Sequence, residues 1–99
     1  DGRPTALLCG NDIIAQGVIH GAQGLGLTVP DDLSVMGIGD FKGSAEMEPG
    51  LTTIGIPARD IGRIAGERFT ALITGATDEL FRIRCPLTCI ARCTTRVLA

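Results

Sequence analysis

The amino-acid sequence predicts an α/β fold in which helices cover both faces of a parallel sheet, giving three layers. Three apolar runs, at residues 5–9, 33–38 and 51–56, are too short for helices and are typical of buried parallel strands. Two longer segments, residues 13–24 and 58–74, carry apolar residues at helical spacing. Strands that alternate with helices in this order favour a parallel sheet joined by crossover helices.

The first strand is separated from the first helix by Gly10, Asn11 and Asp12. A side-chain oxygen of Asn11 or Asp12 can accept a hydrogen bond from the free amides of the first helical turn, so either residue is a candidate cap. The helix face predicted to pack on the sheet consists of apolar and small residues at helical spacing, namely Ile14, Val18, Gly21 and Leu25.

The second strand, residues 33–38, stops at Gly39 and Asp40. Ligands of open α/β sheets bind outside the carboxyl ends of the strands. Asn11, Gly39 and Asp40 follow predicted strands and are therefore the candidate ligand-binding residues. The Asn11 amide offers a donor and an acceptor, which suits a ligand that carries hydroxyl groups. The alternatives are a helix cap only for Asn11 and a turn residue only for Gly39.

The second half of the chain is predicted less sharply. Residues 41–47 form a short helix or an irregular loop, and residues 51–56 form the third strand. Pro57 suits the first turn of the second helix, residues 58–74, because its missing amide is not needed there. Residues 80–84 alternate apolar with basic side chains as an edge strand does, and residues 87–95 resume as a further strand.

Composition excludes several classes of function. The net charge of -2, the pI near 5.2 and the lack of a basic run argue against a DNA-binding surface on these residues. No apolar run approaches the roughly 20 residues that cross a bilayer, and no secretory leader precedes the first strand, so we expect a cytoplasmic protein with no membrane partner. No nucleophile with an adjacent base and no phosphate-binding motif is visible, so we expect no enzyme activity and no cofactor.

The four cysteines and the single histidine do not form an obvious metal site. Cys9 lies in a strand-like run, and no CxxC pair exists, so we expect free and mostly buried thiols rather than disulfides. Cys85, Cys89 and Cys93 are spaced by four residues, about 13 Å between neighbours on an extended strand, which is too far for one zinc ion. His20 has no second histidine to act with, so we expect no metal site.

Three segments carry a family resemblance. In order, CGNDIIAQG (residues 9–17), VPDDLSVMGIGD (residues 29–40) and PGLTTIGIP (residues 49–57) resemble the final third of LacI-family (lactose-repressor) transcription regulators. The resemblance implies a type I periplasmic-binding-protein-like fold, present here as a partial domain. Residues 1–99 would be the C-terminal portion of an effector-binding and dimerisation domain, without the helix-turn-helix and most of the N-terminal lobe. The chain would cross between lobes near Ile56 and near Pro86, which places the helix at residues 58–74 in the other lobe.

The resemblance also implies a function. Such a regulator, most often a repressor, senses a small-molecule effector, is a homodimer, and binds operator DNA only through its helix-turn-helix. The position of Asn11 often contacts effector in the family. Gln16, His20 and Met47 fall where its subunits meet and are candidates for a dimer interface, with ordinary surface as the alternative.

The sequence departs from the family at Gly39, where many sugar- and purine-binding members carry Asp. Loss of a carboxylate removes like-charge repulsion, which favours a sugar acid over a neutral sugar as effector. The same pattern resembles gluconate-type repressors. A solute-binding protein of the same fold that serves transport is the alternative function.

Overall fold

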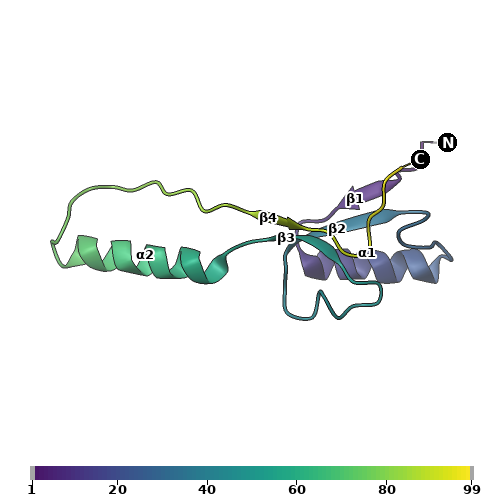
Figure 1. Cartoon of the computed structure of the whole chain (residues 1–99), viewed down its shortest axis with the longest axis horizontal. Coiled ribbons are helices and arrows are strands. Elements are labelled where there is room, and N and C mark those ends of the chain that lie inside the picture. Colours follow the sequence, from purple (N-terminus) through teal and green to yellow (C-terminus); the bar gives the residue numbers. More distant parts are fainter. Residues whose placement is uncertain (1, 99) are drawn as a thin grey trace. The chain divides into compact units, whose positions relative to one another are not determined.

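The structure is a computed structural model that describes residues 2–98, and its chain forms two compact units (Figure 1). Unit 1 contains the chain up to Ile56 and again from Thr88, and unit 2 is Pro57–Leu87. These two crossing points agree with those implied by the family resemblance, near Ile56 and Pro86.

Unit 1 is built on a four-stranded sheet in the order β1-β2-β3-β4. The strands are β1 (Ala6–Leu8), β2 (Ser34–Gly39), β3 (Thr52–Gly55) and β4 (Thr88–Ile90). β2 pairs in parallel with β1 and with β3, which confirms the three predicted parallel strands. β4 is antiparallel to β3, with Thr88 opposite Gly55, so the sheet as a whole is mixed. The chain leaves the sheet after Gly55, at the end of β3, and returns to it at Thr88, opposite Gly55. A strand that starts beside the end of β3 and pairs with it runs antiparallel to β3.

The strand predicted for residues 87–95 is therefore only partly correct. Regular pairing ends at Ile90, and the following segment folds back over the start of β2. The buried Thr94 fixes it there, because its hydroxyl donates to Val35 O at 2.6 Å and accepts from Thr52 N at 2.9 Å. A side chain that bonds two neighbouring strands in this way replaces the ladder that a longer β4 would make.

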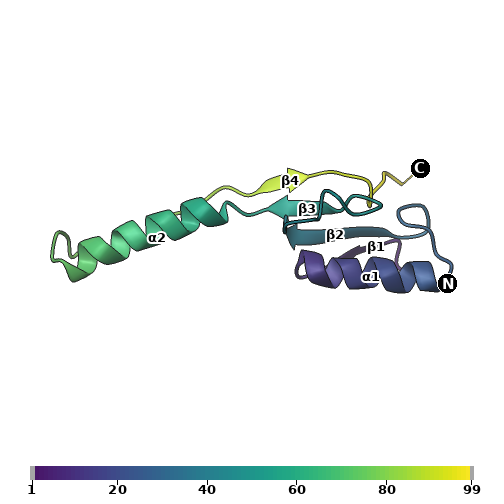
Figure 2. The ribbon, with the colours of Figure 1, turned by 90° about the horizontal axis from the view of Figure 1, so that it is seen from below.

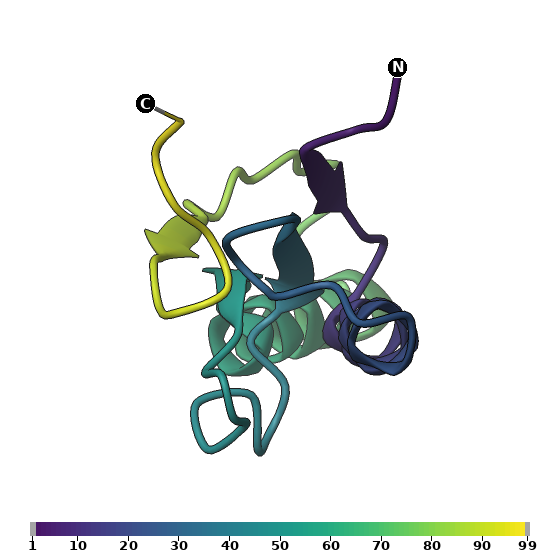
Figure 3. The ribbon, with the colours of Figure 1, turned by 90° about the vertical axis from the view of Figure 1, so that its right-hand side faces the viewer.

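Helix α1 (Asp12–Gly24) lies along one face of the sheet (Figures 2 and 3). The residues buried on it are Asp12, Ala15, Ile19 and Ala22. This face is one residue away from the predicted face, a rotation of about 100°, and the predicted Ile14 is 53% exposed. The prediction of the packing face was right only for Val18, which is partly buried and packs against the core. It was wrong for the rest because two apolar stripes share the helical period, and small alanines allow closer approach to the sheet than isoleucine does.

The opposite face of the sheet is open within unit 1. Ala6 and Leu8 pair with Ser34 and Met36, so these four side chains share the face away from α1. Leu8 is 65% exposed, and none of the three β1 residues is buried. The prediction that the first strand is buried was wrong, because the unit's own helix covers one face only.

Unit 2 contains helix α2 (Ala58–Ile73), close to its predicted range, with Pro57 at the cap position. No residue of α2 is buried, although the Arg68 guanidinium lies 3.9 Å from the centre of the Phe81 ring. The edge strand predicted at residues 80–84 is absent from the described structure. An alternating sequence becomes a strand only when a neighbouring strand is present to pair with it.

Candidate functional site

The carboxyl ends of β1 and β2 bring the three candidate ligand residues to one edge of the sheet. Asn11 follows β1, while Gly39 ends β2 and Asp40 comes directly after it. Because β1 and β2 are parallel neighbours, their carboxyl ends point in the same direction. The structure therefore places the predicted residues where α/β folds bind ligands. Their role in binding stays a prediction.

Asn11 is the cap of helix α1. Its backbone is extended, and its Oδ1 accepts a hydrogen bond from Ile14 N at 2.9 Å. This satisfies one free amide of the first turn. Within residues 2–98 its Nδ2 group has no partner, so the same side chain can cap the helix and still donate to a ligand.

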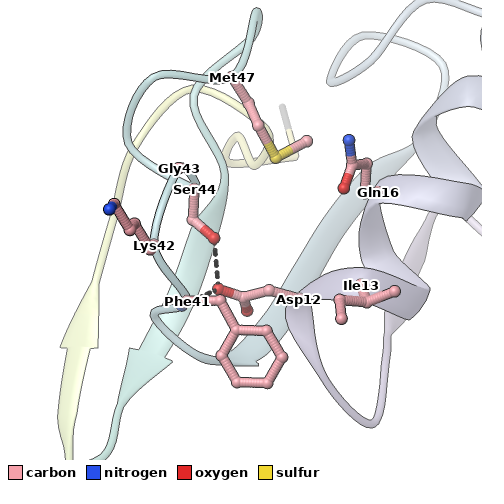
Figure 4. Close-up of a pocket in the computed structure, with 8 residues that line it drawn as sticks. All are labelled: Asp12, Ile13, Gln16, Phe41, Lys42, Gly43, Ser44 and Met47. Atoms are coloured by element: carbon pink, nitrogen blue, oxygen red, sulfur yellow. Dashed lines mark hydrogen bonds between the residues drawn. The ribbon is translucent and has the colours of Figure 1, made fainter.

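The centre of the edge is Asp12, a residue that is only 3% exposed. Its Oδ2 accepts hydrogen bonds from Phe41 N at 2.8 Å and from Ser44 Oγ at 2.6 Å. Its Oδ1 accepts one from Thr53 Oγ1 at 2.6 Å. Figure 4 shows the carboxylate facing Ser44 and the start of the loop at Phe41. One carboxylate thus joins the start of α1 to the loop after β2 and to strand β3.

Thr53 extends this network to the candidate Asp40. Its hydroxyl donates to Asp12 and accepts a hydrogen bond from Asp40 N at 3.2 Å. Gly37 permits the close approach of Asp12, because a Cβ at position 37 would overlap the Asp12 carboxylate. The backbone amides of Asp40 and Phe41 are both held, so the loop after β2 has a fixed conformation.

The environment of Asp12 keeps it ionised. Burial by itself raises the pKa of this carboxyl, because it disfavours charge. Hydrogen bonds from Ser44, Thr53 and the Phe41 amide, with the nearby charge of Arg92, outweigh burial, and the pKa is lowered from its ordinary value. An ionised acceptor makes the stronger hydrogen bonds, so the loop is held most firmly at neutral pH.

Gly39 and Asp40 make the sharp reversal at the end of β2. Gly39 has φ +123° and Asp40 has φ +50°, and both values lie in the region that favours glycine. A Cβ at position 39 would overlap the Phe41 ring. Position 39 is therefore glycine for two structural reasons, which supports its role as a turn residue and is compatible with a ligand role.

The Asp40 carboxylate is already paired. Its Oδ1 lies 2.8 Å from Nη2 of Arg92, and the two side chains are 35% and 18% exposed. Arg92 also donates from Nη1 to Leu51 O at 3.0 Å, which anchors it to the start of β3. Asp40 can still contact a ligand through its backbone, but its charge is neutralised by Arg92.

The predicted dimer residues do not all lie together. A cavity of about 160 Å³ lies between α1 and the loop after β2. Gln16 and Met47 both line it, Met47 half-buried and Gln16 exposed (Figure 4). His20 is exposed on α1, but it does not line this cavity. A role for these residues in dimerisation stays a prediction.

Comparison with known proteins identifies the family. The sequence model of the periplasmic binding protein-like domain matches residues 1–95. The chain belongs to that family. Catabolite control protein A of Priestia megaterium is 38% identical over 86 residues, which are 87% of this chain and 26% of that protein. The HTH-type transcriptional repressor PurR of Serratia proteamaculans (strain 568) is 45% identical over 71 residues, 72% of this chain and 20% of that one.

Solved structures agree with the resemblance to the LacI family, which is thereby confirmed. The lac repressor dimer bound to operator and the anti-inducer ONPF is 34% identical with a TM-score of 0.84, over 93% of this chain and 32% of that chain. A LacI family regulator from Enterococcus faecium with bound ribose is 26% identical with a TM-score of 0.86, over 96% and 35%. This chain spans about a quarter of the length of catabolite control protein A.

The cysteines of this periplasmic binding protein-like chain are free, but the prediction that most are buried was wrong. Cys9 is buried, and burial raises the pKa of its thiol, while Cys89 and Cys93 are exposed. Cys89 lies in β4 and Cys93 follows it. β4 is an edge strand, and among the described residues no strand pairs with its outer side. Among residues 2–98, no cluster of three potential ligands could hold a metal, and neither helix is long and apolar enough to span a bilayer.

Sequence reasoning missed the partners of Asp12. The sequence suggested Asp12 only as an alternative to Asn11 for the helix cap. In the structure Asn11 is the cap, and the buried Asp12 carboxylate accepts hydrogen bonds from Phe41, Ser44 and Thr53. Phe41, Ser44 and Thr53 lie 29, 32 and 41 residues away in the sequence. No local pattern signals bonds over such distances, although Gly37 inside a buried strand indicates close approach of another group.

Proposed function

We propose that this chain is the C-terminal, effector-sensing and dimerising portion of a LacI-type regulator of transcription, most often a repressor. The observation that carries the proposal is the edge formed by Asn11, Gly39 and Asp40, in a chain of this family. The free Nδ2 of Asn11 and the fixed backbone after β2 supply polar groups in defined positions, as small-molecule sites do. Binding there biases the conformation of the regulator and requires no catalytic step.

The effector that this edge favours is a sugar or, more specifically, a sugar acid. Position 39 carries no carboxylate, Asp40 is paired with Arg92, and Asp12 is buried and occupied by hydrogen bonds. An anionic ligand therefore meets no free carboxylate among these residues. A LacI family regulator from Enterococcus faecium has been solved with bound ribose, and one from Arthrobacter sp. FB24 in complex with lactose. These relatives support a carbohydrate as the ligand class, and the charge at the edge supports an acid.

The rest of the proposal concerns assembly and location. A second copy binds through a surface that includes Gln16, His20 and Met47, and operator DNA is bound through a helix-turn-helix elsewhere in the polypeptide. Relatives described as HTH-type repressors and a lac repressor dimer on operator support this arrangement. A cytoplasmic location fits the four free thiols. In the transport alternative, a secretion leader would take the place of the helix-turn-helix, and the sequence of the full-length polypeptide distinguishes the two.

A thermal-shift experiment on the full-length protein tests the effector proposal. The probes are D-gluconate as sugar acid, D-glucose as neutral sugar, and hypoxanthine as purine. A ligand at about 100 times its Kd stabilises the native state by roughly 2.7 kcal/mol, which raises the Tm by about 5–10 °C for a domain of this class. We expect the largest shift with D-gluconate. If the folded protein shows no shift with any sugar or sugar acid, the proposal is refuted.

A variant of Asn11 separates ligand binding from helix capping. Asn11→Ser keeps a neutral side-chain oxygen that can cap α1, so the Tm without ligand should stay within about 2 °C of the wild type. The serine hydroxyl lies one bond closer to the backbone and does not reach the position of Nδ2, so the shift produced by the bound ligand should fall. Asn11→Ala is the control that loses both properties and about 1 kcal/mol of stability. An unchanged ligand shift in Asn11→Ser would show that Asn11 is a cap only.

A further inference from the structure

The Phe41 ring lies at the carboxyl edge of the sheet, next to Gly39. It lies against the Cα of Gly39 and fills the space that a side chain at position 39 would need. The ring extends beside Asp12 and away from Met47 (Figure 4). A large apolar side chain is thus placed directly next to the residues proposed to bind the effector.

The ring is both held and accessible. Phe41 N donates to Asp12 Oδ2 at 2.8 Å, and the preceding amide, Asp40 N, donates to Thr53 Oγ1 at 3.2 Å. These bonds fix the backbone from which the ring projects. Phe41 is nevertheless 40% exposed. A fixed aromatic ring that keeps this much exposed surface loses little conformational entropy when a ligand covers it.

We propose that Phe41 is a specificity-determining residue of the effector site, which rests on the function proposed above. The ring takes the place of a side chain at position 39, so the ligand is contacted there by an aromatic surface instead of a carboxylate. The ligand of this site is therefore a sugar acid. The C–H face of the sugar acid lies against the ring, and its oxygens accept hydrogen bonds from Asn11 Nδ2. Ligand pockets commonly combine an aromatic wall with a few placed polar groups in this way.

The chemistry of the ring also bears on charge. An aromatic ring carries no net charge and has a positive edge, so it does not repel an anionic group that lies beside it. A carboxylate in the same space would repel that group and would favour hydroxyl donors of a neutral sugar. An aromatic ring in place of a carboxylate therefore predicts a higher affinity for a sugar acid than for the corresponding neutral sugar.

Titration calorimetry on the full-length protein tests this inference with three substitutions of Phe41. Phe41→Tyr keeps the aromatic ring, Phe41→Leu keeps apolar bulk without it, and Phe41→Ala removes both. Phe69→Ala is the matched control, because Phe69 is exposed on α2 in unit 2. D-gluconate and D-glucose are the two probes, and the Tm of each variant without ligand is measured in parallel.

We expect Phe41→Tyr and Phe69→Ala to bind D-gluconate within about threefold of the wild type, and Phe41→Leu and Phe41→Ala to bind it about tenfold more weakly. A purely structural role would lower the Tm of Phe41→Ala but leave the affinity of the folded Phe41→Leu unchanged. That result, with a wild type that binds D-gluconate, overturns the inference and leaves the proposed function standing. A folded wild type that binds neither probe overturns both.

Discussion

The substitution Asp12→Asn gives the most direct test of the network at the sheet edge. It keeps the size of the side chain but replaces an ionised acceptor with a neutral amide that has one acceptor oxygen. In the orientation that keeps the bonds from Phe41 N and Ser44 Oγ, the new Nδ2 faces the Thr53 hydroxyl. The Thr53 O–H then loses its acceptor, because an amide NH2 group donates hydrogen bonds and cannot accept them.

The magnitude follows from the three hydrogen bonds that the carboxylate accepts. A hydrogen bond to a charged group contributes about 1.5–3 kcal/mol, and a neutral one about 0.5–1.5 kcal/mol. Losing the bond from Thr53 and weakening the other two predicts a loss of roughly 3 kcal/mol in the free energy of unfolding of unit 1. This is a large part of the roughly 5–15 kcal/mol that stabilises a typical domain.

Urea unfolding of the full-length protein, followed by far-ultraviolet circular dichroism, measures this loss. The chain has no Trp and no Tyr, so intrinsic fluorescence does not report on it. Asp31→Asn is the matched control, because Asp31 is an exposed carboxylate that lies 3.7 Å from Arg96. We expect the control to change stability by less than about 0.5 kcal/mol. If Asp12→Asn is equally mild, the buried network does not stabilise the fold as argued.

Three further predictions follow from the same structure. Because the folded pKa of Asp12 is lowered, its contribution is complete above the unfolded pKa of about 3.9 and is lost as pH falls through the folded value. The difference in urea midpoint between wild type and Asp12→Asn should therefore be constant between about pH 5 and about pH 7 and shrink below about pH 4. A difference that grows in acid would contradict this. Gly37→Ala should destabilise by about 2 kcal/mol or more, because the new Cβ overlaps the Asp12 carboxylate, and an unchanged Tm would show that Asp12 can move away freely. Ile19→Ala should cost about 2–4 kcal/mol and Ile14→Ala less than about 1 kcal/mol, since Ile19 is buried and Ile14 is exposed; equal urea midpoints for the two variants would contradict the observed packing face.

Much of the secondary structure could be predicted from local sequence. Strands β2 and β3 and both helices lie within one or two residues of their predicted ranges. Runs of apolar residues, breakers and caps act over a few neighbours, so their effect is visible without the fold. The same holds for Asn11, Gly39 and Asp40, because residues that follow parallel strands necessarily meet at one edge.

Other features depend on partners that are distant in the sequence. Residues 80–84 have the alternation of a strand, but no strand lies beside them among the described residues. The direction of β4 is set by the point at which the chain returns to the sheet at Thr88, opposite Gly55. Strand pairing is a property of two segments, so one segment's pattern cannot decide it.

Local sequence was enough to indicate the family, the order of the elements from β1 to α2, and the meeting of Asn11, Gly39 and Asp40 at the carboxyl edge of the sheet. Which face of α1 is buried, and which groups donate hydrogen bonds to Asp12, depend on the three-dimensional fold. Ile14 and Ala15 belong to two different apolar faces of α1 with the same helical period. Because Asp12 is buried beside Gly37, the helix is rotated so that the face containing Ala15 packs on the sheet. The physical reason is that periodicity is a local property, whereas a buried carboxylate needs donors from wherever the fold places them, here from Phe41, Ser44 and Thr53.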